Sequence, residues 1–186
     1  LCICSMGCYD TLLTFLPVVL QLKGISATEA SASALMFPVG FLIAGPVVGA
    51  VSDKVGLRKP FIYILGFSSA LLILLIPYLA QLGLWATILL VGFSLSGILT
   101  LVLAISSEHP ELSRSVGGAI GVISSLGNMG SFQFPILVGF LIDATKSLDP
   151  PLSLLAVISG ATVVLNLAIL ETGRLKVDRW RPAAGH

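Results

Sequence analysis

The acidic residue Asp10 lies in the middle of an apolar run that extends from Leu1 to about residue 22. If this run spans a membrane, a carboxylate at that depth costs about 3 kcal/mol on insertion scales, and such residues are usually functional. Asp10 could take up a proton and so couple proton movement to transport, or it could bind a cationic group. Equally, it could lie near an interface or in a structural hydrogen bond. Tyr9 and Thr14 are neighbouring candidates for hydrogen bonding to a ligand.

Two neutral amides, Asn128 and Gln133, lie in a later apolar run and could bind a polar ligand. Hydrogen bonding between helices is the commoner use of such side chains in membranes, so both interpretations stay open. The cysteines Cys2, Cys4 and Cys8 have no histidine nearby. The sequence therefore predicts no metal site and no cofactor.

A short charged loop between two apolar runs reads G-A-V-S-D-K-V-G-L-R-K from residue 49 to residue 59. Gly49 shares a helix face with Gly45, where the missing side chains permit close contact between helices. Asp53 ends the helix at the membrane surface, and Gly56 permits a turn with positive φ. The basic residues of the loop, which favour the cytoplasmic side of a membrane, are Lys54, Arg58 and Lys59.

The composition places these residues in a membrane protein. Hydrophobic residues make up 56% of the 186 positions and charged residues 10%, against about 25% charged residues in soluble domains, and the mean hydropathy is +1.04. The net charge of +1 offers no basic surface for nucleic acid. Apolar stretches of about 20 residues, the length that crosses a bilayer, cover residues 1–22, 28–51, 60–80, 84–106, 115–142 and 151–171. We expect an all-α membrane protein in contact with lipid, with one domain over 1–171 and a tail over 172–186.

The positive charges are distributed unevenly between the loops. Most follow the second, fourth and sixth runs, whereas Lys23 and Lys146 lie on the other side. Loops rich in Lys and Arg face the cytoplasm. We therefore expect loop 52–60 and the C-terminus to be cytoplasmic, in a plasma or inner membrane.

The loop over residues 49–59 resembles the signature of the major facilitator superfamily, G-x-x-x-D-[RK]-x-G-x-[RK]-[RK], at each fixed position. In that family the loop joins the second and third helices of a six-helix repeat, which is its place here. The resemblance implies one half of a twelve-helix secondary transporter that moves a small-molecule substrate by alternating access, with ion or proton coupling as in symport. It also implies that Asp53 and Arg58 gate the transporter, and that the missing six-helix half is a partner.

The fifth run resembles the glycine-rich, proline-bearing fifth helix of such a repeat, and its end, F-L-I-D-A-T, resembles the end of the eleventh helix of many members. This favours the C-terminal half, although the loop at residues 49–59 matches the usual first-half signature. The resemblance implies that runs one and four line the path, runs two and five meet the other half, and runs three and six lie outside. Helix packing, more than substrate binding, is expected of Gly121, Gly127, Gly130, Pro135 and Gly139.

Two other classes of function remain as alternatives. A non-transporting membrane subunit or receptor built on a transporter half would have the same sequence features. A membrane-embedded enzyme, such as a lipid phosphotransferase, would need clustered Asp or His for Mg²⁺. The loops offer Asp53 alone and then Glu108, His109 and Glu111, without paired D-x-x-D spacing. We therefore expect no enzyme, and whether the chain is a fragment or a half-size protein stays open.

Overall fold

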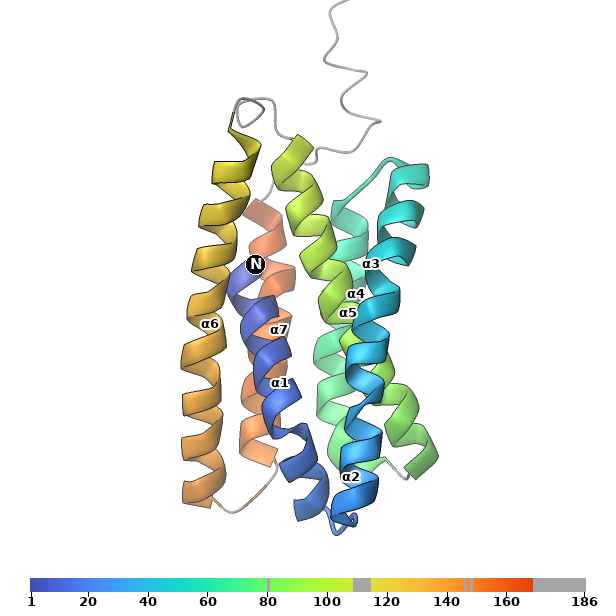
Figure 1. The fold of residues 1–186 in the computed structure, drawn as a ribbon, viewed down its shortest axis with the longest axis vertical. Coiled ribbons are helices and arrows are strands. Elements are labelled where there is room, and N and C mark those ends of the chain that lie inside the picture. Colours follow the sequence, from blue (N-terminus) through green and yellow to red (C-terminus); the bar gives the residue numbers. More distant parts are fainter. Residues whose placement is uncertain (80, 109–114, 146, 148, 169–186) are drawn as a thin grey trace, which may run out of the picture.

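The computed structural model describes residues 1–79, 81–108, 115–145, 147 and 149–168, and in these ranges it contains helices but no strand (Figure 1). The elements in chain order are α1 (Cys2–Leu22), α2 (Ala27–Ala34), α3 (Met36–Val55), α4 (Lys59–Leu75), η1 (Ile76–Tyr78), α5 (Gln81–Glu108), α6 (Val116–Thr145), α7 (Asp149–Leu165) and η3 (Asn166–Ala168). Within the described residues, six segments are long and apolar enough to cross a membrane. They confirm the predicted all-α class with six spans, whereas the predicted tail lies outside the described residues.

The second span is divided at Leu35, between α2 and α3, where the sequence analysis expects one uninterrupted run. Pro38 lies in the first turn of α3. Proline has no N–H to donate and its ring clashes with the carbonyl one turn earlier, so a helix is interrupted just before it. Together α2 and α3 still form a span, over Ala27–Val55.

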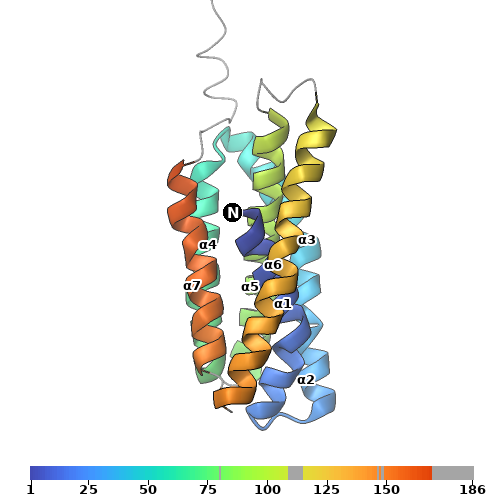
Figure 2. The same cartoon turned by 90° about the vertical axis from the view of Figure 1, so that its left-hand side faces the viewer.

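The helices pack chiefly as three pairs: α3 with α5, α1 with α6, and α4 with α7. Figures 1 and 2 show α4 and α7 together on one side of the bundle, with α1, α3 and α6 toward the opposite side. The turn between α3 and α4 lies at the same end of the bundle as the start of α6, and the turn between α1 and α2 lies at the other end. The bundle therefore has one face lined by α4 and α7 and an opposite face, the front face, lined by α1, α3 and α6.

Glycines let two of these pairs approach to backbone contact. A Cβ on Gly40 of α3 would lie 2.9 Å from the carbonyl carbon of Leu89 in α5 and closer still to its oxygen. Likewise, a Cβ on Gly130 of α6 would lie 3.1 Å from the carbonyl carbon of Ile3 in α1. Because lipid gives helices no hydrophobic reason to associate, such close contacts supply the packing energy that holds the pairs together.

Polar contacts add to this packing. In the α4–α7 pair, the hydroxyl oxygens of Ser69 and Ser159 lie 2.6 Å apart and are buried. After α1, the Nζ of Lys23 donates to the carbonyl oxygens of Ile76, at 3.0 Å, and Leu79. Partial burial lowers the pKa of Lys23. These contacts tie the end of α1 to the end of the third span.

Candidate functional site

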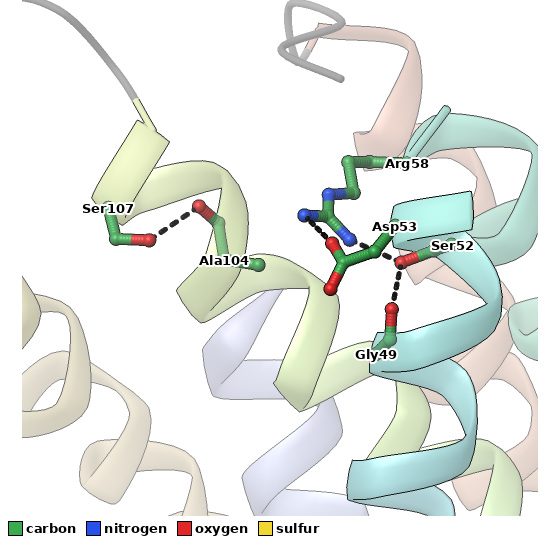
Figure 3. Close-up of polar contacts among 6 residues, drawn as sticks. All are labelled: Gly49, Ser52, Asp53, Arg58, Ala104 and Ser107. Carbon is green, nitrogen blue, oxygen red and sulfur yellow. Dashed lines mark hydrogen bonds and ion pairs between the residues drawn. The ribbon is translucent and has the colours of Figure 1, made fainter. Parts of the chain in front are cut away.

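The turn between α3 and α4 is held by hydrogen bonds that close on Arg58. Gly56 has a φ of 71°, a conformation that glycine adopts without strain, and its N–H donates to the carbonyl of Ser52 at 2.9 Å. The side chain of Arg58 lies over the end of α3 (Figure 3). Its Nη2 is 2.5 Å from Oδ1 of Asp53, and its Nη1 donates to Oγ of Ser52. The Ser52 hydroxyl donates in turn to the carbonyl of Gly49 at 3.2 Å. We call these five residues the α3–α4 network.

The two charges of this network lie in different environments. The side chain of Arg58 is 7% exposed, whereas that of Asp53 is 54% exposed. Removing one partner of a buried ion pair costs about 3–5 kcal/mol, because the other charge is left uncompensated. Water screens the exposed carboxylate of Asp53, so the cost of removing one partner here lies at or below the lower end of that range. The pair thus holds the turn with its guanidinium buried and its carboxylate open to solvent.

The other loop residues surround this network. The side chain of Lys54 is exposed, and Lys59 is the first residue of α4, where its carbonyl accepts a hydrogen bond of 3.1 Å from the amide nitrogen of Asn166. A Cβ on Gly49 would lie at an ordinary contact distance of 3.8 Å from Thr100 of α5. The motif spacing could have identified Ser52, which lies within it. Nothing in the sequence pairs Asn166 with a residue 107 positions earlier.

Asp10 forms a hydrogen bond between the two helices of the α1–α6 pair. Its Oδ2 accepts from the hydroxyl of Ser131 in α6, and both side chains are partly buried. A carboxylate accepting from a hydroxyl keeps lone pairs available for a further donor or a proton. Asp10 therefore keeps acceptor capacity beyond its hydrogen bond to Ser131, at the contact between α1 and α6.

The neighbours of Asp10 point elsewhere. The Tyr9 ring stacks on the Phe37 ring of α3, with ring centroids 5.1 Å apart. Its centroid also lies 4.3 Å from that of the Phe41 ring. The Thr14 hydroxyl donates to the backbone carbonyl of Asp10 at 2.8 Å and not to its carboxylate. Tyr9 thus joins α1 to α3, while Asp10 joins α1 to α6.

Comparison with known proteins decides the family. The sequence matches the Major Facilitator Superfamily over residues 1–185. The chain belongs to the major facilitator superfamily. It is also 25% identical over 170 residues to an uncharacterized protein of Archaeoglobus fulgidus, a match that covers 90% of this chain and 75% of that protein. The chain is therefore an integral membrane protein of a family whose members transport small solutes across membranes, and its six spans correspond to one half of the fold.

In this major facilitator half, the glycines of α6 differ in their surroundings. A Cβ on Gly127 would lie 2.6 Å from Sδ of Met6, and one on Gly139 would lie 3.4 Å from the Phe15 ring, so both glycines face α1, as Gly130 does. By contrast, a Cβ on Gly121 would meet nothing within 4 Å. The structure thus brings three of the four candidate packing glycines against α1.

The remaining candidate residues of α6 are placed as follows. Pro135 lies inside the helix and is partly buried. The side chains of Asn128 and Gln133 are exposed on its surface. Within the described part of the chain, no group of three or more His, Cys, Asp or Glu side chains could hold a metal ion. Among the described residues of this major facilitator half, Asp10 with Ser131 and the α3–α4 network are two polar sites on which a mechanism can be argued.

Proposed function

We propose that the chain is half of a secondary transporter that moves a small solute by alternating access, with coupling to a proton or another ion. Family membership supports the transport of small solutes. Asp10 supports the coupling, because ionisable residues inside spans mark proton and ion pathways, and a hydroxyl of α6 holds this carboxylate in place. A proton or a cationic solute that neutralises it would favour the conformation in which the site is closed to water.

The proposed cytoplasmic end is the one that carries the α3–α4 turn. Among the described residues, Lys54, Arg58 and Lys59 lie at that end, and Lys23 follows α1 at the other. Positive charge is enriched on cytoplasmic loops, which supports this orientation in a plasma or inner membrane. We assign the chain to the C-terminal half, because the end of α6 resembles the end of an eleventh family helix.

In this proposal α1 and α5 line the path, α6 and the span formed by α2 and α3 meet a second six-helix half, and α4 and α7 face lipid. The burial of the spans supports this assignment, since α5 is the most buried span and α6 and the second span are the least buried. A span with few buried side chains in an isolated half has the largest surface available for the other half.

The α3–α4 network carries the gating part of the proposal. Arg58 is buried and its ion pair with Asp53 closes the end of α3 against the start of α4. An interaction of a few kcal/mol at a helix junction is large enough to hold one conformation and small enough for substrate binding to reverse it. We propose that the network holds the cytoplasmic end in one state and rearranges during the cycle.

Asp53→Asn tests this gate. Asparagine keeps the size and one oxygen but removes the negative charge of the pair with Arg58. We therefore expect uptake of a panel of radiolabelled sugars, amino acids and organic cations into proteoliposomes to fall at least about tenfold, the factor that corresponds to 1.4 kcal/mol. Asp149→Asn, an exposed carboxylate in the first turn of α7, is the matched control and should retain wild-type uptake. Wild-type uptake by Asp53→Asn at equal reconstitution would show that the network is not a gate.

A further inference from the structure

Although α3 and α4 are consecutive, they belong to different packed pairs. The chief partner of α3 is α5, and that of α4 is α7. The α3–α4 network therefore joins two pairs, with Asp53 in the last turn of α3 and Arg58 just before α4. The turn between them contains Gly56, whose backbone accepts many conformations. The place of Arg58 over α3 thus depends on what holds the start of α4.

The start of α4 is held by the end of the sixth span, which covers Asp149–Ala168. Asn166, the first residue of η3, has no exposed surface, and its Nδ2 donates to the carbonyl oxygen of Lys59 at 3.1 Å. Lys59 is the first residue of α4 and directly follows Arg58. This hydrogen bond therefore fixes the backbone one residue away from the guanidinium-bearing position of the network.

The contact continues a polar seam along the α4–α7 pair, whose helices lie side by side (Figure 2). The hydroxyls of Ser69 and Ser159 contact each other near the middle of the pair. Toward the turn, a Cβ on Gly66 would lie 2.7 Å from the hydroxyl oxygen of Thr162, so the two helices are close there as well. Asn166 follows about one helical turn later. The seam therefore passes a shift of the sixth span directly to the start of α4.

Stability alone does not explain an asparagine at this position. The Oδ1 of Asn166 is buried and has no hydrogen-bond partner among the described residues. An unpaired buried oxygen costs at least about as much free energy as one amide hydrogen bond returns. An apolar side chain of similar size would avoid that cost. The amide is better explained by the group that it holds, the carbonyl of Lys59.

We propose that Asn166 is a positioning residue of the α3–α4 network: by fixing the start of α4 to the end of the sixth span, it sets the place of Arg58 over Asp53. Its consequence for uptake rests on the proposed gating function. The sixth span contributes no residue to the network, yet through Asn166 it acts on the gate, because a movement of this span relative to α3 draws Arg58 away from Asp53.

Hydrogen–deuterium exchange of the purified full-length protein in detergent tests this role. Asn166→Leu removes both the donor and the unpaired oxygen at nearly constant size. We expect the amides of Gly56 and Ile62, on either side of Arg58, to exchange about threefold to tenfold faster, the factor that one hydrogen bond contributes to a local opening. The Tm should stay at or above that of the wild type. Wild-type exchange at both amides would overturn the proposal, as would a lower Tm with faster exchange throughout the chain.

Two further variants complete the exchange experiment. Asn166→Ala also lacks the donor and cannot clash with its neighbours, so it should accelerate the same two amides. Ser159→Ala is the matched control, because it removes a buried hydrogen bond of the same helix pair about ten residues of α4 away from the turn. It should leave exchange at Gly56 and Ile62 unchanged. Equal acceleration in Ser159→Ala would assign the effect to the pair as a whole and overturn the role of Asn166.

Uptake of the solute panel separates this proposal from the gating function. If the network gates, Asn166→Leu lowers uptake, and Asp53→Asn combined with Asn166→Leu falls no further than Asp53→Asn alone. A combined loss equal to the product of the two single losses would show that Asn166 does not act through the network and would overturn the proposal. Faster exchange in Asn166→Leu, with wild-type uptake by both single variants, supports the positioning of Arg58 and refutes the gate.

Discussion

The substitution Gly40→Ala tests the packing on which the α3–α5 pair depends. The new methyl group would lie 2.9 Å from the carbonyl carbon of Leu89 and closer still to its oxygen, against 3.4 Å or more in an ordinary contact, so the two helices must separate by more than about 0.5 Å. The obstacle is backbone, which has no rotamer to change. Overpacking of this kind costs about 1–3 kcal/mol, and alanine returns up to about 1 kcal/mol through its higher helix propensity. We therefore expect a net loss of about 1–2 kcal/mol.

Thermal unfolding in detergent, followed by tryptophan fluorescence, measures this loss. For a chain of this size 1 kcal/mol corresponds to about 2–4 °C, so the Tm of Gly40→Ala should fall by about 2–8 °C. Gly160→Ala in α7 is the matched control, because its Cβ would lie at an ordinary 3.7 Å from Ala70. The control should melt at or above the wild-type temperature. Equal Tm values for the two variants would refute the claim that backbone contact at Gly40 holds the pair.

Two further predictions concern Asp10, which lies within the first span, and Lys23, which follows its end. Asp10→Asn should abolish solute-dependent proton movement, read from a pH-sensitive dye inside proteoliposomes, while solute exchange across the same vesicles persists; unchanged proton movement would exclude Asp10 from coupling. Lys23→Met removes the hydrogen bonds to Ile76 and Leu79 and should lower the free energy of unfolding by about 1–2 kcal/mol. Because burial lowers the pKa of Lys23, the unfolded chain binds its proton more tightly, and the wild-type Tm should rise as the pH approaches the ordinary lysine pKa of 10.5. A pH slope that persists in Lys23→Met would assign it to another group.

The six spans could be predicted from the sequence because bilayer thickness fixes their length and lipid demands apolar side chains. The network at the α3–α4 turn is similarly local. Asp53 and Arg58 are five residues apart, so the turn that Gly56 permits brings them together in any bundle that contains it. The break at Leu35 could also have been predicted from Pro38. The continuous apolar run around this proline instead suggested one uninterrupted helix.

Contacts between distant spans could not be predicted, because they depend on where two helices cross. The sequence pointed to Gly45 and Gly49 as sites of close approach, yet Cβ atoms there would lie 3.7 and 3.8 Å from Thr100, an ordinary distance. The tighter contact lies earlier in the same helix, at Gly40. Ser131 was likewise one polar residue among several in its run, and only the crossing of α1 and α6 identifies it as the partner of Asp10.

The position of Gly130 explains how a carboxylate can be held at this depth. Serine has a short side chain, so Ser131 reaches Asp10 only if the backbones of α1 and α6 are close. They are close because Gly130 presents no Cβ to Ile3, whose carbonyl carbon would otherwise lie 3.1 Å from it. The hydrogen bond that results offsets part of the cost of a carboxylate within the membrane. The glycine pattern of α6 and the acidic residue of α1 are therefore parts of one site, in which packing comes first and sets the distance over which the polar groups act.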